Sequence, residues 1–232
     1  MQMSHETNAS NVVIHPNHFH HQNQNSYCNH RLFVPVVDQR IQSICPGFQG
    51  LSWRLGGEEW KSIFSVNNML PFHYCEVGVL HGANLISVAR AFCNHMASTI
   101  VAIDPFTDYP EYQEFRGEQA SNYSTFLHNL NICALSQRVQ HYRKFSHQAL
   151  VELQDSYFHV IYLDSTNLAR TILEDSILAW RKLAPSGILI INKYKNAGND
   201  GTKHAVDVFV SFHMNQIVQH YELNNQYIVC KK

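Results

Sequence analysis

The residues of this chain best placed to do chemistry begin in the stretch HYCEVGVLHGAN, at positions 73–84. An acid, Glu76, is followed by two glycines, Gly78 and Gly82, and then by the expected first turn of a helix at Asn84. Glycine lets the backbone turn without a Cβ, and the N-terminal end of a helix presents free N–H groups. The stretch predicts a tight strand-to-helix turn that brings a ligand against the backbone and beside a carboxylate. For the glycine pair alone, an ordinary tight turn is the alternative.

A second acid, Asp104, ends the next apolar run, TIVAID. In a doubly wound sheet, ligands bind at the carboxyl ends of the strands, where such an acid accepts hydrogen bonds from the hydroxyls of a ribose. Binding of a nicotinamide dinucleotide requires the fingerprint GxGxxG, and Glu76 stands in place of its first glycine. Glu76 therefore disfavours a nicotinamide-dependent oxidoreductase. The two acids together favour a ligand that joins a ribose to a positively charged amino-acid part.

The elements that must position these acids alternate along the chain. Short apolar runs typical of buried strands are separated by stretches of helical length, which predicts an α/β fold with a parallel sheet covered on both faces. The expected strands are 73–79, 99–104, 139–143, 159–164 and 187–192, and the expected helices are 83–95, 119–134, 147–154, 169–184 and 202–214. The last two apolar runs flank Asn224–Asn225, and such a two-residue turn predicts an antiparallel hairpin.

The first 70 residues differ in composition from the rest. Residues 1–30 are rich in Asn, Gln and His, which predicts a flexible tail. A transition-metal site at His15, His18, His20 and His21 is the less favoured alternative, because no second cluster of ligands accompanies them. Residues 31–70 are expected to form a helical lead-in, with an amphipathic helix over EEWKSIFSVNNML, and residues 71–232 to form the main domain.

The composition limits the partners and the location of the protein. The chain has 232 residues, 17 Lys plus Arg against 18 Asp plus Glu, and a net charge of -1. Without a basic stretch, nucleic acid is not expected as a partner, and no apolar run approaches the roughly 20 residues of a membrane span. The polar N-terminus is unlike a signal peptide. Six scattered cysteines without a CxxC pair favour reduced, buried thiols, so we expect an intracellular, cytoplasmic protein.

The motifs from about Glu58 to Lys232 resemble those of the class I S-adenosylmethionine-dependent methyltransferases. The first motif of that family, acid-x-Gly-x-x-x-Gly, is matched by Glu76, Gly78 and Gly82, while VAIDPF is similar to the second motif and FHVIYLD to the fourth. Within the family the chain is most similar to the small-molecule O-methyltransferases of the macrocin and novobiocin type, which modify sugars and antibiotics. The resemblance implies a Rossmann-like seven-stranded sheet in the order 3-2-1-4-5-7-6, with strand 7 antiparallel and helices on both faces.

The resemblance also implies a set of residues around S-adenosylmethionine. Asp104 would hold the ribose, Glu76 would anchor the local network, and the two glycines would lie under the methionine part. Phe106 or Ser146 would border the adenine, although Ser146 is equally suited to cap the following helix. His81 would face either the cofactor or the solvent. The implied cofactor-binding residues are Glu76, Gly78, His81, Gly82, Asn84, Asp104, Phe106, Ser146 and Asp164.

Members of the resembled branch carry three aspartates, after the fourth and fifth strands, that bind a magnesium ion. This chain keeps Asp164 but has Asn192 and Lys193 where the other two would stand. A protonated lysine repels a divalent cation, so a magnesium site is not expected. The resemblance makes Asp164, Asn192 and Lys193 the candidate catalytic residues.

Two functions are compatible with this departure from the motif. In the first, the Lys193 ammonium replaces the charge of the metal and stabilises the alkoxide of an acceptor, or a neutral Lys193 accepts its proton. The chain is then a metal-independent O-methyltransferase for a small hydroxylated molecule such as a sugar. In the second, Asp164 and Lys193 form a plain salt bridge, and the chain is a catalytically degenerate, cofactor-binding pseudoenzyme that serves as a scaffold or partner subunit. The identity of the acceptor and the formation of a homo-oligomer stay open.

Overall fold

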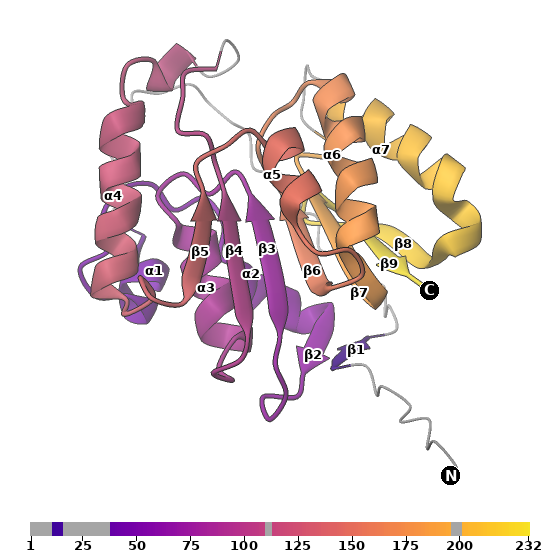
Figure 1. The fold of residues 1–232 in the computed structure, drawn as a ribbon, viewed down its shortest axis with the longest axis horizontal. Coiled ribbons are helices and arrows are strands. Elements are labelled where there is room, and N and C mark those ends of the chain that lie inside the picture. The colour runs from indigo at the N-terminus through magenta and orange to yellow at the C-terminus, as the bar shows by residue number, and fades with distance from the viewer. Residues whose placement is uncertain (1–10, 16–37, 110–112, 196–200) are drawn as a thin grey trace.

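The apolar runs that predicted strands pair in one sheet. The computed structural model describes residues 11–15, 38–109, 113–195 and 201–232, and at its centre lies a seven-stranded sheet with the order β5-β4-β3-β6-β7-β9-β8 (Figure 1). Its strands are β3 (His73–Val77), β4 (Thr99–Ile103), β5 (Val139–Tyr142), β6 (Phe158–Leu163), β7 (Leu183–Asn192), β8 (Ile217–Leu223) and β9 (Gln226–Lys231). The first five are parallel, whereas β9 runs antiparallel to both of its neighbours, β7 and β8. The predicted strand order, antiparallel last strand and terminal hairpin are confirmed.

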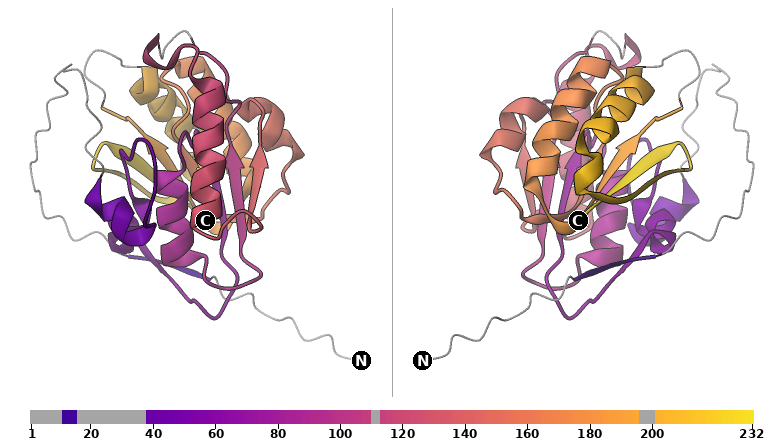
Figure 2. Two further views of the ribbon diagram at one scale, coloured as in Figure 1. Left: turned by 90° about the vertical axis from the view of Figure 1, so that its left-hand side faces the viewer. Right: turned by 90° about the vertical axis from the view of Figure 1, so that its right-hand side faces the viewer.

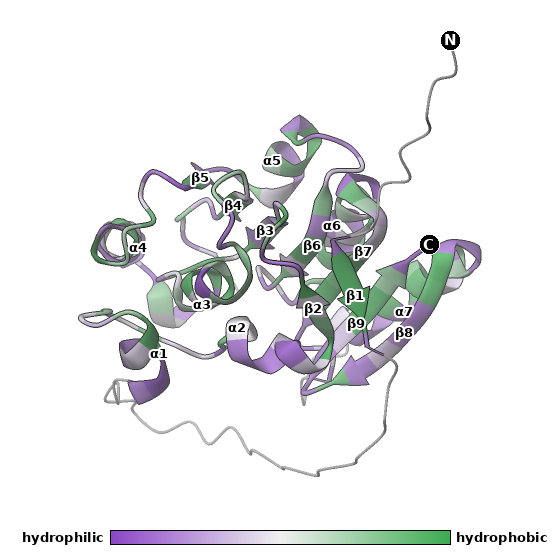
Figure 3. Ribbon diagram, turned by 90° about the horizontal axis from the view of Figure 1, so that it is seen from below, coloured by the Kyte–Doolittle hydropathy of each residue, from purple (hydrophilic) through white to green (hydrophobic). Residues whose placement is uncertain are grey.

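Two layers of helices cover this sheet (Figure 2). One face carries α1 (Gln39–Ile44), α2 (Gly56–Glu59), α3 (Ala83–Phe92) and α4 (Gln119–Ile132), and the other carries α5 (Ser146–Glu152), α6 (Ala169–Lys182) and α7 (Gly201–His213). Because side chains alternate along a strand, Tyr74 packs with the first layer and Cys75 with the second. Hydrophobic residues are concentrated on the strands between the layers (Figure 3). Both faces of the sheet are therefore buried, as the α/β prediction requires.

The lead-in departs from the helix predicted over residues 58–70. Helix α2 ends at Glu59, a short 3-10 helix follows at Trp60–Ser62, and the chain then forms strand β2 (Phe64–Val66). This strand pairs antiparallel with β1 (Val12–Ile14), which lies inside the predicted flexible tail, so both predictions are wrong for these residues. Aromatic and β-branched residues favour a strand once a partner strand is present, and local periodicity cannot reveal that partner.

Most of the predicted tail, residues 1–10 and 16–37, lies outside the described residues. His15 is described, and its backbone N–H donates to Ile63 O at 2.9 Å, beside the β1–β2 pair. His18, His20 and His21 lie outside the described range, so the metal-site alternative at these histidines stays untested.

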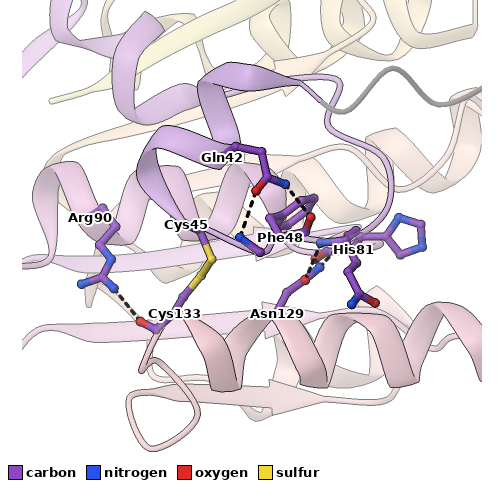
Figure 4. The surroundings of a disulfide bond; sticks show 9 residues. Gln42, Cys45, Phe48, His81, Arg90, Asn129 and Cys133 are labelled. Atoms are coloured by element: carbon purple, nitrogen blue, oxygen red, sulfur yellow. Dashed lines mark hydrogen bonds between the residues drawn. A yellow bond between two sulfur atoms is a disulfide. The ribbon is translucent and has the colours of Figure 1, made fainter.

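Two cysteines contradict the expectation that all thiols are reduced. Cys45, at the end of α1, forms a disulfide with Cys133, at the end of α4 (Figure 4). The sequence does not predict this pair, because the two cysteines are 88 residues apart and come together only in the folded chain. Disulfides are typical of oxidising compartments, so the cysteines no longer support a cytoplasmic location. Among the described residues, Cys75, Cys93 and Cys230 are free and buried, as predicted.

Reduction of this disulfide is expected to lower the free energy of unfolding by about 2–4 kcal/mol. A cross-link across 88 residues restricts the unfolded chain far more than the folded one. Dithiothreitol should therefore lower the melting temperature by about 5–15 °C, and the double variant Cys45→Ser, Cys133→Ser should melt at the same reduced temperature. The matched control is the double variant itself, whose melting should not respond to dithiothreitol. A wild-type melting temperature that ignores the reductant would rule out the cross-link.

Candidate active site

The carboxyl ends of β3, β4 and β6 lie side by side in the sheet (Figure 1). A cleft opens there, where the sequence predicted a ligand site. The helix after β3 packs on one face of the sheet and the helix after β6 on the other, and this switch point is where open α/β sheets bind ligands. The cleft contains about 790 Å³ of empty space, its open mouth included. It is lined by Leu51, Trp53, Arg54, Glu76, Gly78, Val79, Leu80, His81, Ala83, Asn84, Asp104, Tyr109, Phe115, Gln119, Asp164, Ser165 and Lys193.

The turn after β3 is held in a conformation that only glycine adopts easily. Gly78 has φ of 84°, and a Cβ on it would lie 2.4 Å from the backbone oxygen of Asp164. Leu80 follows with φ of 46°, which is uncommon for a residue with a side chain. Gly82, also at 84°, is the N-cap of α3, and a Cβ there would approach the ring of Phe126 at 3.1 Å. The tight turn is therefore as predicted, with Gly78 at the cleft and Gly82 packed towards α4.

Asp104 stabilises this turn as well as lining the cleft. Its Oδ2 accepts the backbone N–H groups of Val79 and Leu80, both at 3.1 Å, and its Oδ1 accepts that of Phe106 at 2.9 Å. Burial raises the pKa of the Asp104 carboxyl, and the three backbone donors oppose that effect. Because a carboxylate has about four acceptor sites, this arrangement leaves room for one ligand hydroxyl rather than two.

Glu76 is the centre of a buried hydrogen-bond network at the cleft. Its Oε2 accepts from the Tyr74 hydroxyl at 2.7 Å and from Asn84 Nδ2 at 3.0 Å, while Asn84 Oδ1 accepts the Gly56 N–H at 2.7 Å. Burial raises the pKa of Glu76 to about 8; its two donors oppose this shift, and nearby carboxylates such as Asp164 add to it. A cationic ligand would favour the charged form of Glu76, so the site is suited to positive charge.

One side of α3 receives the lead-in segment. Three polar side chains, two on one side of α3 and one in the turn before it, each accept a backbone N–H of the lead-in. The pairs are Leu51 N–H to His81 Nδ1 at 2.9 Å, Gly56 N–H to Asn84 Oδ1 at 2.7 Å, and Gly57 N–H to Ser87 Oγ at 2.9 Å. The predicted cofactor residues His81 and Asn84 therefore line the cleft and also bind the lead-in. Their spacing was the available signal, and it was not used in the prediction.

Asp164 and Lys193 meet at the cleft from the ends of β6 and β7. Lys193 Nζ lies 3.0 Å from Asp164 Oδ1, and the two side chains are 23% and 18% exposed. Tyr162 donates a hydrogen bond to Asp164 Oδ2 at 3.2 Å. Lys193 has φ of 61°, a sparsely populated conformation of the kind that clusters at functional sites. The lysine thus stands beside the aspartate, as both functional hypotheses require.

Two further predicted residues lie beside the cleft without lining it. Phe106 packs against the rings of Tyr123 and Phe126, with centroids 4.9 and 5.6 Å away. Ser146 borders an adjoining hollow that also includes Gly78 and Asp104. The helix cap alternative for Ser146 is wrong, because Phe145 is the N-cap of α5 and Ser146 bonds to Asp175 instead. The adenine roles of Phe106 and Ser146 stay predictions.

Asn192 points away from its two proposed catalytic partners. It borders a separate small cavity with Asp175 and Thr166 on the side of α6, and its Oδ1 is buried there without a hydrogen-bond partner. The strand explains this placement, since neighbouring residues of β7 face opposite sides of the sheet. A catalytic role for Asn192 is therefore not supported by its position.

Sequence reasoning missed the second wall of the cleft, which the lead-in supplies. Trp53 is 62% exposed, its ring centroid lies 5.9 Å from that of Phe115, and both residues line the cleft. Arg54 is fixed by an ion pair with Glu59 and donates to Asn224 O at 3.1 Å. In the sequence, Trp53 and Arg54 are adjacent and lie between Gly50 and Gly56. A tryptophan–arginine pair of this kind is too common to predict a binding site.

The described residues contain no group of three or more His, Cys, Asp or Glu side chains arranged to hold a metal ion. At the position that the resemblance gives to a magnesium ligand, the Lys193 ammonium lies beside Asp164, and this pair does not fit a divalent cation. Within the same described part of the chain, no helix has the length and apolar character needed to span a membrane.

Comparison with known proteins agrees with the fold. An O-methyltransferase from Bacillus cereus, solved in complex with SAH, has 14% identity and a TM-score of 0.55, over 87% of this chain and 94% of that one. The O-methyltransferase TomG from Streptomyces achromogenes, solved in complex with SAM, has 14% identity and a TM-score of 0.51, over 68% and 72%. No curated protein matches the sequence. The family model described as a methyltransferase domain matches residues 75–194, which is more than half of the chain and runs from within β3 to beyond the end of β7. The protein therefore belongs to the methyltransferase-domain family.

Proposed function

We propose that the protein transfers the methyl group of S-adenosylmethionine to a hydroxyl group of a small molecule, without a resident metal ion. The observation that carries this proposal is the placement of three carboxylates, Glu76, Asp104 and Asp164, around one cleft beside the constrained Gly78. S-adenosylmethionine carries a sulfonium and an ammonium group, so its net charge at that end suits such a set of acids. Two structures of similar fold are complexes with SAM and SAH, and this supports the same cofactor here.

The residues present fit the cofactor well. Gly78 lines the cleft and lets the turn pass close to the backbone of Asp164, where a Cβ would collide, and Asp104 keeps an acceptor site for one ribose hydroxyl. Ser146 borders the adjoining hollow, where the adenine would lie. When bound, the cofactor supplies an electrophilic methyl group on a sulfonium.

The role of Lys193 is to stabilise negative charge on the acceptor oxygen. Its ammonium is held by Asp164 at 3.0 Å and both groups line the cleft. A positive charge is thus already placed beside the acceptor hydroxyl, and the Asp164 carboxylate is the base that takes its proton as the methyl group leaves the sulfonium. A preorganised charge of this kind stabilises a developing oxyanion without rearrangement during the reaction. The cleft walls hold the acceptor in line with the methyl group, and such proximity contributes several kcal/mol, on the order of 7–11 in the best cases.

The ion pair also favours a second candidate, a cofactor-binding pseudoenzyme that acts as a scaffold or partner subunit. In that case Asp164 neutralises Lys193 for structural reasons alone, and partly buried pairs of this type are common without catalysis. The two candidates share the cofactor and differ only in turnover.

Titration calorimetry with S-adenosylmethionine and S-adenosylhomocysteine tests the proposal, once in a chelator and once in magnesium. We expect micromolar dissociation constants for both ligands that magnesium does not change. Screening of sugars, phenols and nucleosides with methyl-labelled S-adenosylmethionine then separates the enzyme from the pseudoenzyme. Absence of binding in both buffers would refute the cofactor, and binding without turnover on any acceptor class would favour the scaffold.

The remaining sequence predictions are part of the same proposal. They are a main domain over residues 71–232 with a lead-in over 31–70, and a small-molecule acceptor rather than nucleic acid. The predicted cytoplasmic location rested on reduced cysteines and loses that support through the Cys45–Cys133 disulfide. The lead-in is the part that this proposal modifies, because Trp53 and Arg54 line the cleft and so give it a share in acceptor binding.

A further inference from the structure

Residues 48–54 form a segment of the lead-in that is bound to two other parts of the site (Figure 4). Gln49 and Asn129 of α4 pair reciprocally, with the Gln49 N–H on Asn129 Oδ1 at 2.9 Å and Asn129 Nδ2 on Gln49 O at 2.8 Å. Asn129 Nδ2 also donates to the backbone oxygen of His81 at 2.9 Å. Asn129 thus fixes the start of the segment, and the exposed Trp53 at its other end lines the cleft.

The side chain of His81 provides a second, direct connection between this segment and the glycine turn. Its Nδ1 accepts the Leu51 N–H at 2.9 Å, so Nε2 carries the proton and donates to Asn122 Oδ1 at 3.0 Å. The ring lies against Gly50, where a Cβ would come within 2.4 Å of Nδ1. Both ring nitrogens are therefore engaged inside the protein, and the segment cannot shift without breaking one of these contacts.

We propose that His81 is a positioning residue that couples the two walls of the cleft, so that a ligand bound at the glycine turn also orders residues 48–54, which carry Trp53 and Arg54. This inference rests on the proposed function, in which the glycine turn binds the cofactor and the segment contacts the acceptor. His81 lies within the turn, between Leu80 and the helix cap Gly82, and its side chain reaches the other wall. Restriction of the turn by a ligand therefore restricts the segment as well.

Two substitutions separate the two contacts of His81. In His81→Asn, Oδ1 takes the place of Nδ1 and can still accept the Leu51 N–H, whereas the contact with Asn122 is lost. In His81→Gln, Nε2 takes the place of the ring Nε2 and can still donate to Asn122, whereas Leu51 loses its acceptor. His128→Asn on the exposed side of α4 is the control for the removal of a histidine.

Hydrogen exchange of the full chain, with and without S-adenosylhomocysteine, measures the coupling. In the wild type and in His81→Asn, the ligand should slow exchange in residues 78–84 and also in residues 48–54. In His81→Gln it should slow exchange in residues 78–84 alone, and the Leu51 amide of the free protein should exchange about tenfold faster than in the wild type. Equal protection of residues 48–54 in His81→Gln and the wild type overturns the proposal, as does a loss of coupling in both variants.

The pH dependence of the coupling between the two walls is a second test, because a purely structural role of His81 would not make this coupling depend on pH. Once Nδ1 of His81 is protonated, it can no longer accept the Leu51 N–H, and this hydrogen bond is lost. Burial lowers the pKa of His81, opposed by the Asn122 contact and by the two acids that face the ring, Glu118 beside α4 and Asp104 after β4. The effect of the ligand on acrylamide quenching of Trp53 should thus disappear in the wild type only at a pH below the ordinary pKa of histidine, and it should persist there in His81→Asn. Loss of the effect at the same pH in both proteins overturns the proposal.

Failure of this inference differs from failure of the proposed function. If S-adenosylhomocysteine protects no part of the wild type, the cofactor assignment is wrong. In that case the exchange rate of the Leu51 amide in the ligand-free proteins still tests the hydrogen bond from Leu51 to His81. Equal rates in His81→Asn and His81→Gln would contradict a positioning role for His81.

Discussion

Replacement of Lys193 by methionine is expected to lower turnover by about 10²–10³-fold and to leave the dissociation constant of S-adenosylmethionine within about threefold. Methionine keeps most of the length of the side chain and removes only the ammonium that lies 3.0 Å from Asp164. If that charge stabilises the acceptor oxygen as its proton leaves, its loss affects the transition state and not the bound cofactor. Steady-state kinetics with the acceptor found by screening and calorimetry with the cofactor measure the two quantities.

The chain offers a matched control for this substitution in Lys195. It lies two residues further along, its side chain is 63% exposed, and it pairs with Glu222 outside the cleft. Lys195→Met should retain turnover within about twofold, as is usual for exposed ion pairs. Equal turnover in Lys193→Met and the wild type would contradict a catalytic role of the ammonium and leave the Asp164 pair as a structural contact.

The fold was predictable because its signals are local and repeated. Strands such as VAI before Asp104 are short apolar runs, and each alternates with a helix, so the order of elements alone implies a parallel sheet. The hairpin was equally clear, since Asn224 and Asn225 both adopt the positive φ values, 51° and 62°, that a tight two-residue turn requires. The strand β2 and the Cys45–Cys133 disulfide were not predictable, because each depends on a partner far away in the sequence.

The candidate site was predictable on one wall and not on the other. Glu76 lies near the end of β3, and Gly78 and Asp104 directly follow β3 and β4. The fold brings these strand ends together, and all three residues line the cleft. Trp53 and Arg54 arrive from a segment whose position is fixed by contacts to α3 and α4 and not by any local pattern. Residue type also says nothing about side-chain direction, and for this reason Asn192 was grouped with Lys193 although it faces another cavity.

Replacement of Gly78 by alanine is expected to weaken S-adenosylmethionine binding at least about 100-fold, which corresponds to about 2.7 kcal/mol. Two costs coincide at this residue: φ is 84°, which costs alanine roughly 1 kcal/mol, and the new Cβ would lie 2.4 Å from Asp164 O. Gly117→Ala isolates the first cost, because Gly117 has φ of 78° and nothing within 4 Å of the added Cβ. We expect that control to bind the cofactor within about threefold of the wild type and to lose only about 1 kcal/mol of stability in urea unfolding. Equal binding by Gly78→Ala and Gly117→Ala would mean that the turn relaxes without consequence, and the cofactor would then have to be held by other parts of the cleft.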